Sequence, residues 1–511
     1  MVKKHKKIAT IIMSFIMATT VPTSVFAAPA SYNEAEKDNL AKICEAIASK
    51  WDSTLSDSKD NALSDTETEI RITLDEAGQS MLGMASGMDL SWLNNLGFHV
   101  TASVDSEKQA SSVSLNVNGN DICSFNISSD LTQAMQLLQV PEMSESWVKI
   151  VTGESVMDSQ KLLKDPFSFI PDGNSLSEIV KHYGEIILKY SEDQETSNEA
   201  LVVEDVEEQC TLLEARINGS DTATLIQEIL TSAKEDKELE TVLEKLSVFS
   251  GETDLNSSFQ EYITSALNSM DMDSMQSDEN GYISSKIWIG EDGKTAGREF
   301  AVCDNDGIPV LVLTYKAPEN NDKSAVFFNA ESVTTEALYA TDEEDVSSDF
   351  VEEKNSFSFT GSGENTDGIL KGNYSVSYND ITAAKAEVEL QKDENGYPTG
   401  TIGISFPEDT EESNQLSSFS AKLSLDTNSF GVELFNAGVY LGNMNISSVP
   451  ADEKVSFEIP EQIKEAEEYL TDCNLDKVCN NLKNADVPDE IIQTLQYTFN
   501  PVDTLDVAGI E

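Results

Sequence analysis

Short stretches in which apolar and polar residues alternate recur along most of this 511-residue chain. A period of two places every second side chain on the same side of an extended strand, so each stretch predicts a strand with one apolar and one wet face. Strands of this kind build antiparallel sheets that are covered on one side only. The alternating stretches lie at residues 68–74, 98–104, 113–117, 123–127, 283–289, 298–303, 308–315, 374–378, 402–406, 419–425, 430–434 and 455–459.

Two further signals complete the expected fold. Asn118-Gly119 separates two of the stretches and is typical of a tight β-hairpin turn. Helical spacing of apolar residues predicts helices at 40–51, with Trp51 on the apolar face, at 175–190, with Ser175 as N-cap, and at 222–248, 257–270 and 461–496. The chain is therefore expected to be α+β, with curved antiparallel β-meander sheets packed against amphipathic helices in several lobes.

The order of these patterns suggests a division into segments. An acidic, serine-rich stretch at 341–354 is the best linker or loop candidate. The expected segments are a signal peptide (1–27), an N-terminal helix with a β-meander and further helices (28–250), a helix and β-hairpin segment continuing that lobe (251–340), the linker (341–354), a β-rich lobe (355–460), and C-terminal helices with a tail (461–511).

The N-terminus is typical of a secretory leader. Lysines at positions 3, 4, 6 and 7 precede the apolar run 8–18 and the sequence Val25-Phe26-Ala27. We expect cleavage near Ala27-Ala28 and an extracellular or cell-surface location. Cys44 is the first cysteine, so the leader offers none for lipid attachment. No later stretch has the eighteen or so apolar residues of a membrane span, so no transmembrane anchor is expected.

The charge of the chain restricts its partners. Loss of the leader removes four of the 33 basic residues and none of the 92 acidic ones, which leaves 29 bases and a net charge near −63. Such a charge repels nucleic acid and anionic lipid, and it attracts cations such as Ca²⁺. An EF-type loop aligned on Gly307 would begin with Val302 instead of an oxygen ligand. We therefore predict no metal or cofactor site, beyond weak and diffuse Ca²⁺ binding.

The six cysteines allow up to three disulfides in an exported protein, but a core of this size does not need them. Cys473 and Cys479 are too widely spaced for a zinc knuckle. Free thiols packed as small apolar groups are the simpler expectation.

Catalytic signals are sparse. After leader removal only His99 and His182 remain, and both are expected on polar surfaces. No Gly-x-Ser-x-Gly elbow occurs, and Ser56-Asp57-Ser58-Lys59 lies in what we expect to be an acidic loop. Paired carboxylates could serve a glycosidase, but with 92 acids they carry little information. We predict no catalytic residue, and Trp288 is the one tryptophan considered for an exposed contact.

Three segments carry a resemblance to a known group of proteins. They are the hairpin LNVNGNDICSFNI, the step VPEMSESWVKI and the second hairpin IWIGEDGKTAGREFAV. In this arrangement the chain resembles uncharacterised secreted or lipid-anchored proteins of Firmicutes. More distantly, over about residues 33–330, its layout is similar to the lipoprotein-carrier type of fold, in which a curved antiparallel sheet wraps helices and holds a lipid. The resemblance implies a non-enzymatic envelope protein.

Three functional hypotheses follow. The first is a secreted, non-catalytic envelope protein that binds an apolar small molecule or a cell-envelope component. The second is a secreted, carboxylate-dependent glycan hydrolase, and the third is an accessory protein whose acidic surface meets a basic partner or Ca²⁺. A lipid carrier should enclose an apolar cavity of several hundred cubic ångströms, roughly the size of a ligand pocket. The oligomeric state stays open.

Overall fold

The structure is a computed structural model. It describes residues 31–62, 65–104, 108–130, 135–150, 166–250, 255–270, 281–337, 350–394, 396–407, 418–451, 460 and 462–499. The predicted leader, the strand predicted at 455–459 and residues 341–349 of the predicted linker lie outside the described residues.

The fold is α+β, as the sequence predicts. The described residues contain helices and a large, open, mostly antiparallel sheet of 22 strands. The short pairing of β22 (Ile463–Lys464) with β6 (Trp147–Ile150) is parallel. The chain divides into two compact units, of which unit 1 comprises residues 1–56 and 167–389 and unit 2 comprises residues 57–166 and 390–511.

This division differs from the predicted segments, which follow the order of the chain. Unit 2 combines distant segments because β1 (Thr66–Leu74) pairs along its whole length with β21 (Val439–Pro450). Residues 350–354, predicted to end the linker, belong instead to a long strand, β15 (Phe350–Thr366). Local composition could not reveal that β1 pairs with β21, or that β15 pairs with β14 and β16.

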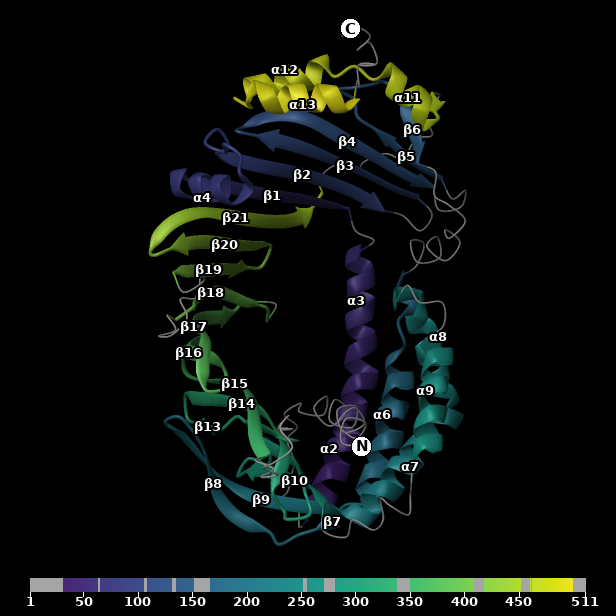
Figure 1. Ribbon diagram of the computed structural model, residues 1–511, viewed down its shortest axis with the longest axis vertical. Helices are drawn as coiled ribbons and strands as arrows, with labels where there is room; N and C mark the ends of the chain where they lie inside the picture. The colour runs from purple at the N-terminus through teal and green to yellow at the C-terminus, as the bar shows by residue number, and fades with distance from the viewer. Residues whose placement is uncertain are drawn as a thin grey trace, which may run out of the picture. The chain divides into compact units, whose positions relative to one another are not determined.

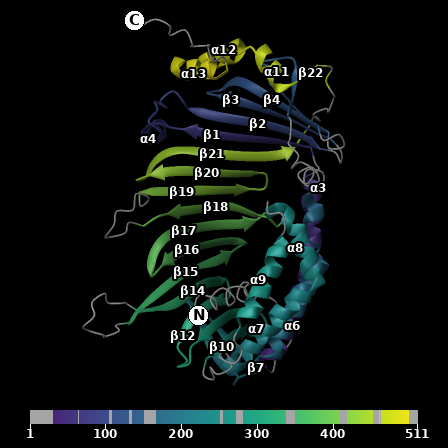
Figure 2. The same cartoon turned by 45° about the vertical axis from the view of Figure 1, so that its right-hand side comes forward.

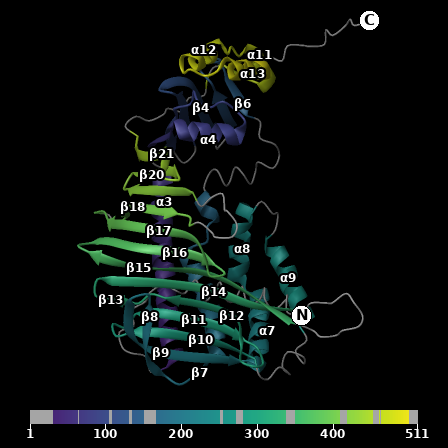
Figure 3. The same cartoon turned by 60° about the vertical axis from the view of Figure 1, so that its left-hand side comes forward.

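Unit 1 contains a curved sheet and a group of helices. From one edge inward, β7 and β8 pair with β9, which is followed by β10, β11, β12, β14, β15 and β16, all antiparallel. In Figure 3 the long strands β14, β15 and β16 follow one another across the sheet. The bounds not yet given are β7 (Glu192–Asp193), β8 (Ser197–Val203), β9 (Val206–Asn218), β10 (Tyr282–Gly290), β11 (Thr295–Cys303), β12 (Pro309–Lys316), β13 (Glu319–Asn320), β14 (Lys323–Ala337), β16 (Ile369–Tyr378) and β17 (Ile381–Lys392).

The helices of unit 1 pack on one another and on strands of the sheet. Helices α2 and α7 contact β9, and α7 also contacts β10 (Figure 1). Buried apolar residues of α6, α7 and α9, including Tyr183, Leu225 and Ile263, form their common core. The helices are α2 (Tyr32–Ala46), the π-turn η1 (Ile47–Trp51), α6 (Gly173–Lys189), α7 (Gly219–Glu235), α8 (Lys237–Ser250) and α9 (Leu255–Ser269). Helix α3 (Asp52–Ala62) and the 3₁₀ turn η2 (Pro166–Phe169) each have residues in both units.

Two predicted helix boundaries are wrong for identifiable reasons. The cap of α6 is Asp172, whose carboxylate accepts the Ser175 N–H at 2.9 Å, so Ser175 lies inside the first turn. The helix predicted at 222–248 is two helices, separated at Asp236. The Asp236 carboxylate accepts the backbone N–H groups of Glu238 and Leu239, at 3.0 and 3.1 Å, and thereby starts α8.

Unit 2 contains the predicted meander. The β3–β4 hairpin turns at Asn118 and Gly119, whose φ angles of 51° and 81° suit a type I′ turn. Asn118 also donates its side-chain N–H groups to the carbonyls of Trp92 and Ala485, at 2.7 and 2.8 Å. The strands of the unit not yet given are β2 (Asn95–Val104), β3 (Lys108–Val117), β4 (Asn120–Asp130), β5 (Met135–Gln139), β18 (Pro398–Ser405), β19 (Phe419–Asp426) and β20 (Ser429–Asn436).

The C-terminal helices predicted at 461–496 are three short ones: α11 (Ala466–Asp472), α12 (Asp476–Asn484) and α13 (Asp489–Phe499). Pro488 separates the last two, and the Asn474 carboxamide accepts the Asp476 N–H where α12 begins. These helices cover β3 and β4, as expected, and bury Val117 and Ile122 against their apolar faces (Figure 2).

Candidate functional site

The residues considered for catalysis do not form a site. His99 is exposed beside Glu67 and Thr101 in unit 2, whereas His182 contacts the Ser232 hydroxyl in unit 1. Ser56 lies in helix α3 and not in the predicted acidic loop. None of these contacts assembles a nucleophile, a base and an orienting group.

Trp288 is buried, contrary to the contact role considered for it. It is 3% exposed and packs with Leu201, Cys210 and Ala296. The Lys316 ammonium lies 5.3 Å from the centre of its ring. The alternating pattern placed Trp288 correctly on the face of β10 opposite Ile287, but it could not show that strand β8 covers this face.

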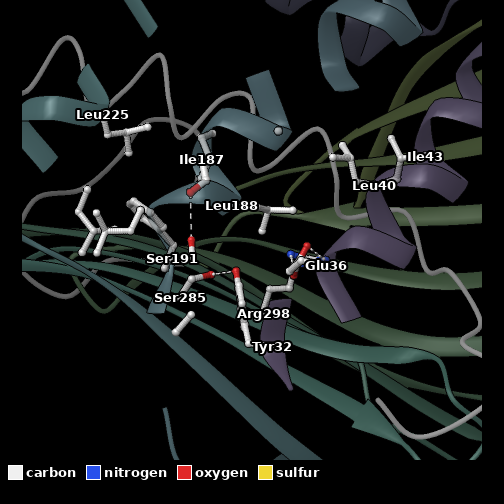
Figure 4. Close-up of a pocket in the computed structure, with 15 residues that line it drawn as sticks. Tyr32, Glu36, Leu40, Ile43, Ile187, Leu188, Ser191, Leu225, Ser285 and Arg298 are labelled. Atoms are coloured by element: carbon white, nitrogen blue, oxygen red, sulfur yellow. Dashed lines mark hydrogen bonds and ion pairs between the residues drawn. The ribbon is translucent and has the colours of Figure 1, made fainter. Parts of the chain in front are cut away.

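An apolar pocket of unit 1 lies between its helices and the sheet. Figure 4 shows α2, α6 and α7 above the strands, with Leu40, Ile187 and Leu225 directed toward the space. The cavity measures about 70 Å³. This is far below the several hundred cubic ångströms expected of an enclosed lipid site, and it has room for only the end of a larger ligand.

One end of this pocket is polar but electrically neutral. The Glu36 carboxylate of α2 meets the Arg298 guanidinium of β11, with Oε1–Nη1 and Oε2–Nη2 distances of 2.7 and 3.2 Å. Both side chains are about nine-tenths buried. Burial by itself would lower the pKa of Arg298, but the carboxylate of Glu36 holds that pKa above its usual value. Arg298 therefore keeps its positive charge, with the Glu36 side chain as its close partner.

A second polar contact lies beside it. The Tyr32 hydroxyl donates to the Ser285 hydroxyl at 2.7 Å, and burial raises the pKa of Tyr32 well above its usual range. The remaining lining is largely aliphatic, from both the helices and the strands. The pocket thus has a largely apolar wall, with the Tyr32 and Ser285 hydroxyl groups and the Glu36–Arg298 ion pair at one end.

The strand register continues the pocket wall across the sheet. In an antiparallel pair, directly opposed residues project from the same face. The register gives two rows of side chains that run across seven strands from β9, and the pocket residues Ala215, Ser285 and Phe300 lie in one row and Arg298 in the other. The Phe357 row contains Ala215, Ser285, Phe300, Leu313, Ala330, Phe357 and Tyr378, and the Phe359 row contains Leu213, Ile287, Arg298, Tyr315, Phe328, Phe359 and Val376.

The outer end of the Phe357 row is aromatic and open to solvent. Phe357 is 42% exposed and Tyr378 is 55% exposed. Phe328 meets Phe357 edge to face at 6.3 Å, and both side chains belong to the helix-bearing face of the sheet. At a strand spacing of about 4.8 Å, the six steps from β9 to β16 span about 29 Å. The two rows are therefore largely buried on β9 to β12, where Leu213, Phe300 and Leu313 are 0–9% exposed, and they reach solvent at Phe357 and Tyr378.

An acidic cleft of about 500 Å³ occupies another part of unit 1. Two of its lining residues, Glu208 and Asp292, have carboxylates close to where a Cβ atom on Gly290 would lie. Burial raises the pKa of Glu208, whereas hydrogen bonds from Lys294 outweigh burial and lower the pKa of Asp292. Glu208 accepts the Glu319 N–H at 2.8 Å, and Asp292 accepts the Lys294 N–H at 2.9 Å. Both carboxylates thus hold neighbouring backbone segments in place through hydrogen bonds, and this structural role accounts for their positions.

Three properties of the described residues bear on partners. They contain no group of three or more His, Cys, Asp or Glu side chains arranged to hold a metal ion. None of their helices is long and apolar enough to cross a membrane. All six cysteines, which lie within the described ranges, are free thiols.

Comparison with known proteins adds no assignment. No protein-family model matches the chain, and no curated protein matches it significantly.

The sequence analysis missed the residues that define the pocket. Arg298 alternates with Phe300 and Val302 on the apolar side of its strand, and it is one of three arginines in the chain. A basic residue in that position predicts a buried acidic partner. The partner itself, Glu36, is 262 positions away, so only the tertiary structure identifies it.

Proposed function

We propose that the protein is an exported, non-catalytic binding protein that holds a linear apolar ligand along the sheet of unit 1. The observation that supports this proposal is the continuity of the Phe357 and Phe359 rows with the pocket. The end of the ligand would enter the pocket, and its chain would lie across the strands toward Phe357 and Tyr378.

The dimensions favour a long ligand over a compact one. The pocket, at about 70 Å³, is too small for a whole lipid, whereas the rows extend far beyond it. Exposed aromatic side chains on one sheet face can contribute to the free energy of binding, because complete burial of a Phe or Tyr side chain contributes about 1.5–3 kcal/mol. A ligand lying on the rows would remove this apolar surface from water.

Charge favours a ligand without negative charge. The chain carries a formal net charge of −59, so an anionic ligand would be repelled at long range. At short range Arg298 is already neutralised by Glu36. The Tyr32 and Ser285 hydroxyl groups remain as partners for a neutral polar end of the ligand.

Native mass spectrometry of the full chain, purified from the cells that make it, tests this proposal. We expect an apolar compound bound at about one per chain and released by solvent extraction. A chain that carries no such compound, and that binds none when a neutral alkyl amphiphile is added, would contradict the proposed function.

A further inference from the structure

Helix α4 (Glu76–Ser86) of unit 2 is fixed to the sheet through one side only (Figure 1). A Cβ atom on Gly78 would lie 2.0 Å from the Leu441 carbonyl oxygen, so only glycine permits this approach of the helix to β21. Asp75 caps the helix by accepting the Gly78 N–H at 2.9 Å. The Gln79 side chain donates to the Leu93 carbonyl at 3.0 Å. Gly78 and Gln79 are therefore the buried side of α4.

Beyond this buried first turn, α4 exposes an apolar stripe to solvent. Met81, Met84 and Ala85 follow the i, i+3, i+4 spacing of one helical face, and Met88 follows just after the helix ends at Ser86. Met84 is 77% exposed and Met88 is 55% exposed, and Leu82 beside them is 41% exposed. We call these five residues the methionine stripe. Contiguous exposed methionine and leucine side chains are typical of surfaces that bind partner helices.

The methionine stripe is held in place and does not depend on a loose loop. The chain turns at Gly87, whose φ is 70°, and folds back until the Met88 carbonyl would lie 2.8 Å from a Cβ on Gly83. The Trp92 indole N–H donates to the Asp89 carbonyl at 3.0 Å and closes the turn. Met88 is thereby kept next to the end of the helix before any partner binds.

Charge identifies the occupant. Asp75 and Glu76 precede the methionine stripe in the sequence and Asp89 follows it, and the chain as a whole carries 92 acidic against 33 basic residues. A second copy of the chain or an anionic bilayer would be repelled. We propose that the methionine stripe docks a cationic amphipathic helix of a partner protein, with the apolar face of that helix on the methionines and its basic residues attracted by the acidic chain.

Peptide titration of the full chain tests this proposal independently of the ligand site in unit 1. The probe is a synthetic leucine–lysine peptide with all leucines on one helical face, and its control is a scrambled peptide of the same composition. We expect the amphipathic peptide to bind at least about tenfold more tightly than the scrambled one. The double variant Met84→Ser/Met88→Ser should abolish that preference, because it removes the buried apolar area.

Leu470→Ser is the matched control, since Leu470 is 55% exposed on α11 of the same unit. It should leave the preference unchanged. Equal binding of both peptides, equal affinity of the double variant, or no binding at all would overturn the proposal. Self-association of the wild-type chain that the double variant loses would also overturn it, in favour of a second copy.

Discussion

Replacing Glu36 with alanine is expected to lower the free energy of unfolding of unit 1 by roughly 3–5 kcal/mol, because Arg298 would be left buried without its counter-charge. Both side chains are about 10% exposed, so solvent screens the pair poorly. Urea denaturation, followed by far-UV circular dichroism and tryptophan fluorescence, measures the change.

The double variant Glu36→Leu/Arg298→Met separates loss of charge pairing from loss of packing. Apolar groups of similar size often replace a buried ion pair without destabilisation, so the double variant should be within about 1 kcal/mol of wild type or more stable. A Glu36→Ala variant as stable as wild type would show that the ion pair is hydrated and that the polar end of the pocket is open to water.

The double variant Phe357→Ser/Tyr378→Ser is expected to weaken binding of a neutral alkyl amphiphile, dodecyl maltoside, by roughly tenfold or more. These two aromatics form the outer part of the Phe357 row and are 42% and 55% exposed. Because they are already in contact with water, the free energy of unfolding should change by only about 1 kcal/mol. Isothermal titration below the micelle concentration measures the affinity.

Val202→Ser provides the control for this prediction. Val202 is 51% exposed on β8, so the substitution removes a similarly exposed apolar side chain outside both rows. The affinity of the Val202→Ser variant for dodecyl maltoside should equal that of the wild-type chain. An equal loss in the control and in the double variant would point to non-specific adsorption.

The sequence predicts the elements of this protein better than their partners. Alternation at 283–289 and 298–303 correctly indicates β10 and β11, and Asn118-Gly119 correctly indicates the β3–β4 turn. These signals are local, since side-chain period and turn conformation depend on neighbouring residues. Apolar spacing at 461–496 correctly indicates C-terminal helices, but it does not mark where they divide, at Pro488 and at Asn474, whose side chain accepts the Asp476 N–H.

Long-range contacts account for what the sequence could not predict. The pairing of β1 with β21 determines the make-up of unit 2, and the Glu36–Arg298 contact defines the pocket. Each contact joins segments hundreds of positions apart. Alternation shows which side chains of a strand share a face, but it does not show which distant segment that strand or side chain contacts. The continuity of the Phe357 row likewise depends on the register of six strand pairs, which no single stretch of sequence specifies.

The chain-length dependence of binding tests the central claim most directly. Octyl, decyl and dodecyl maltosides are titrated into the full chain under identical conditions. If the alkyl chain lies along the rows, affinity should rise about two- to fourfold per methylene at one site, and this increment should shrink in the Phe357→Ser/Tyr378→Ser variant. Affinity that does not depend on chain length, or an increment that the variant leaves unchanged, would contradict the assignment of the sheet face as the ligand site.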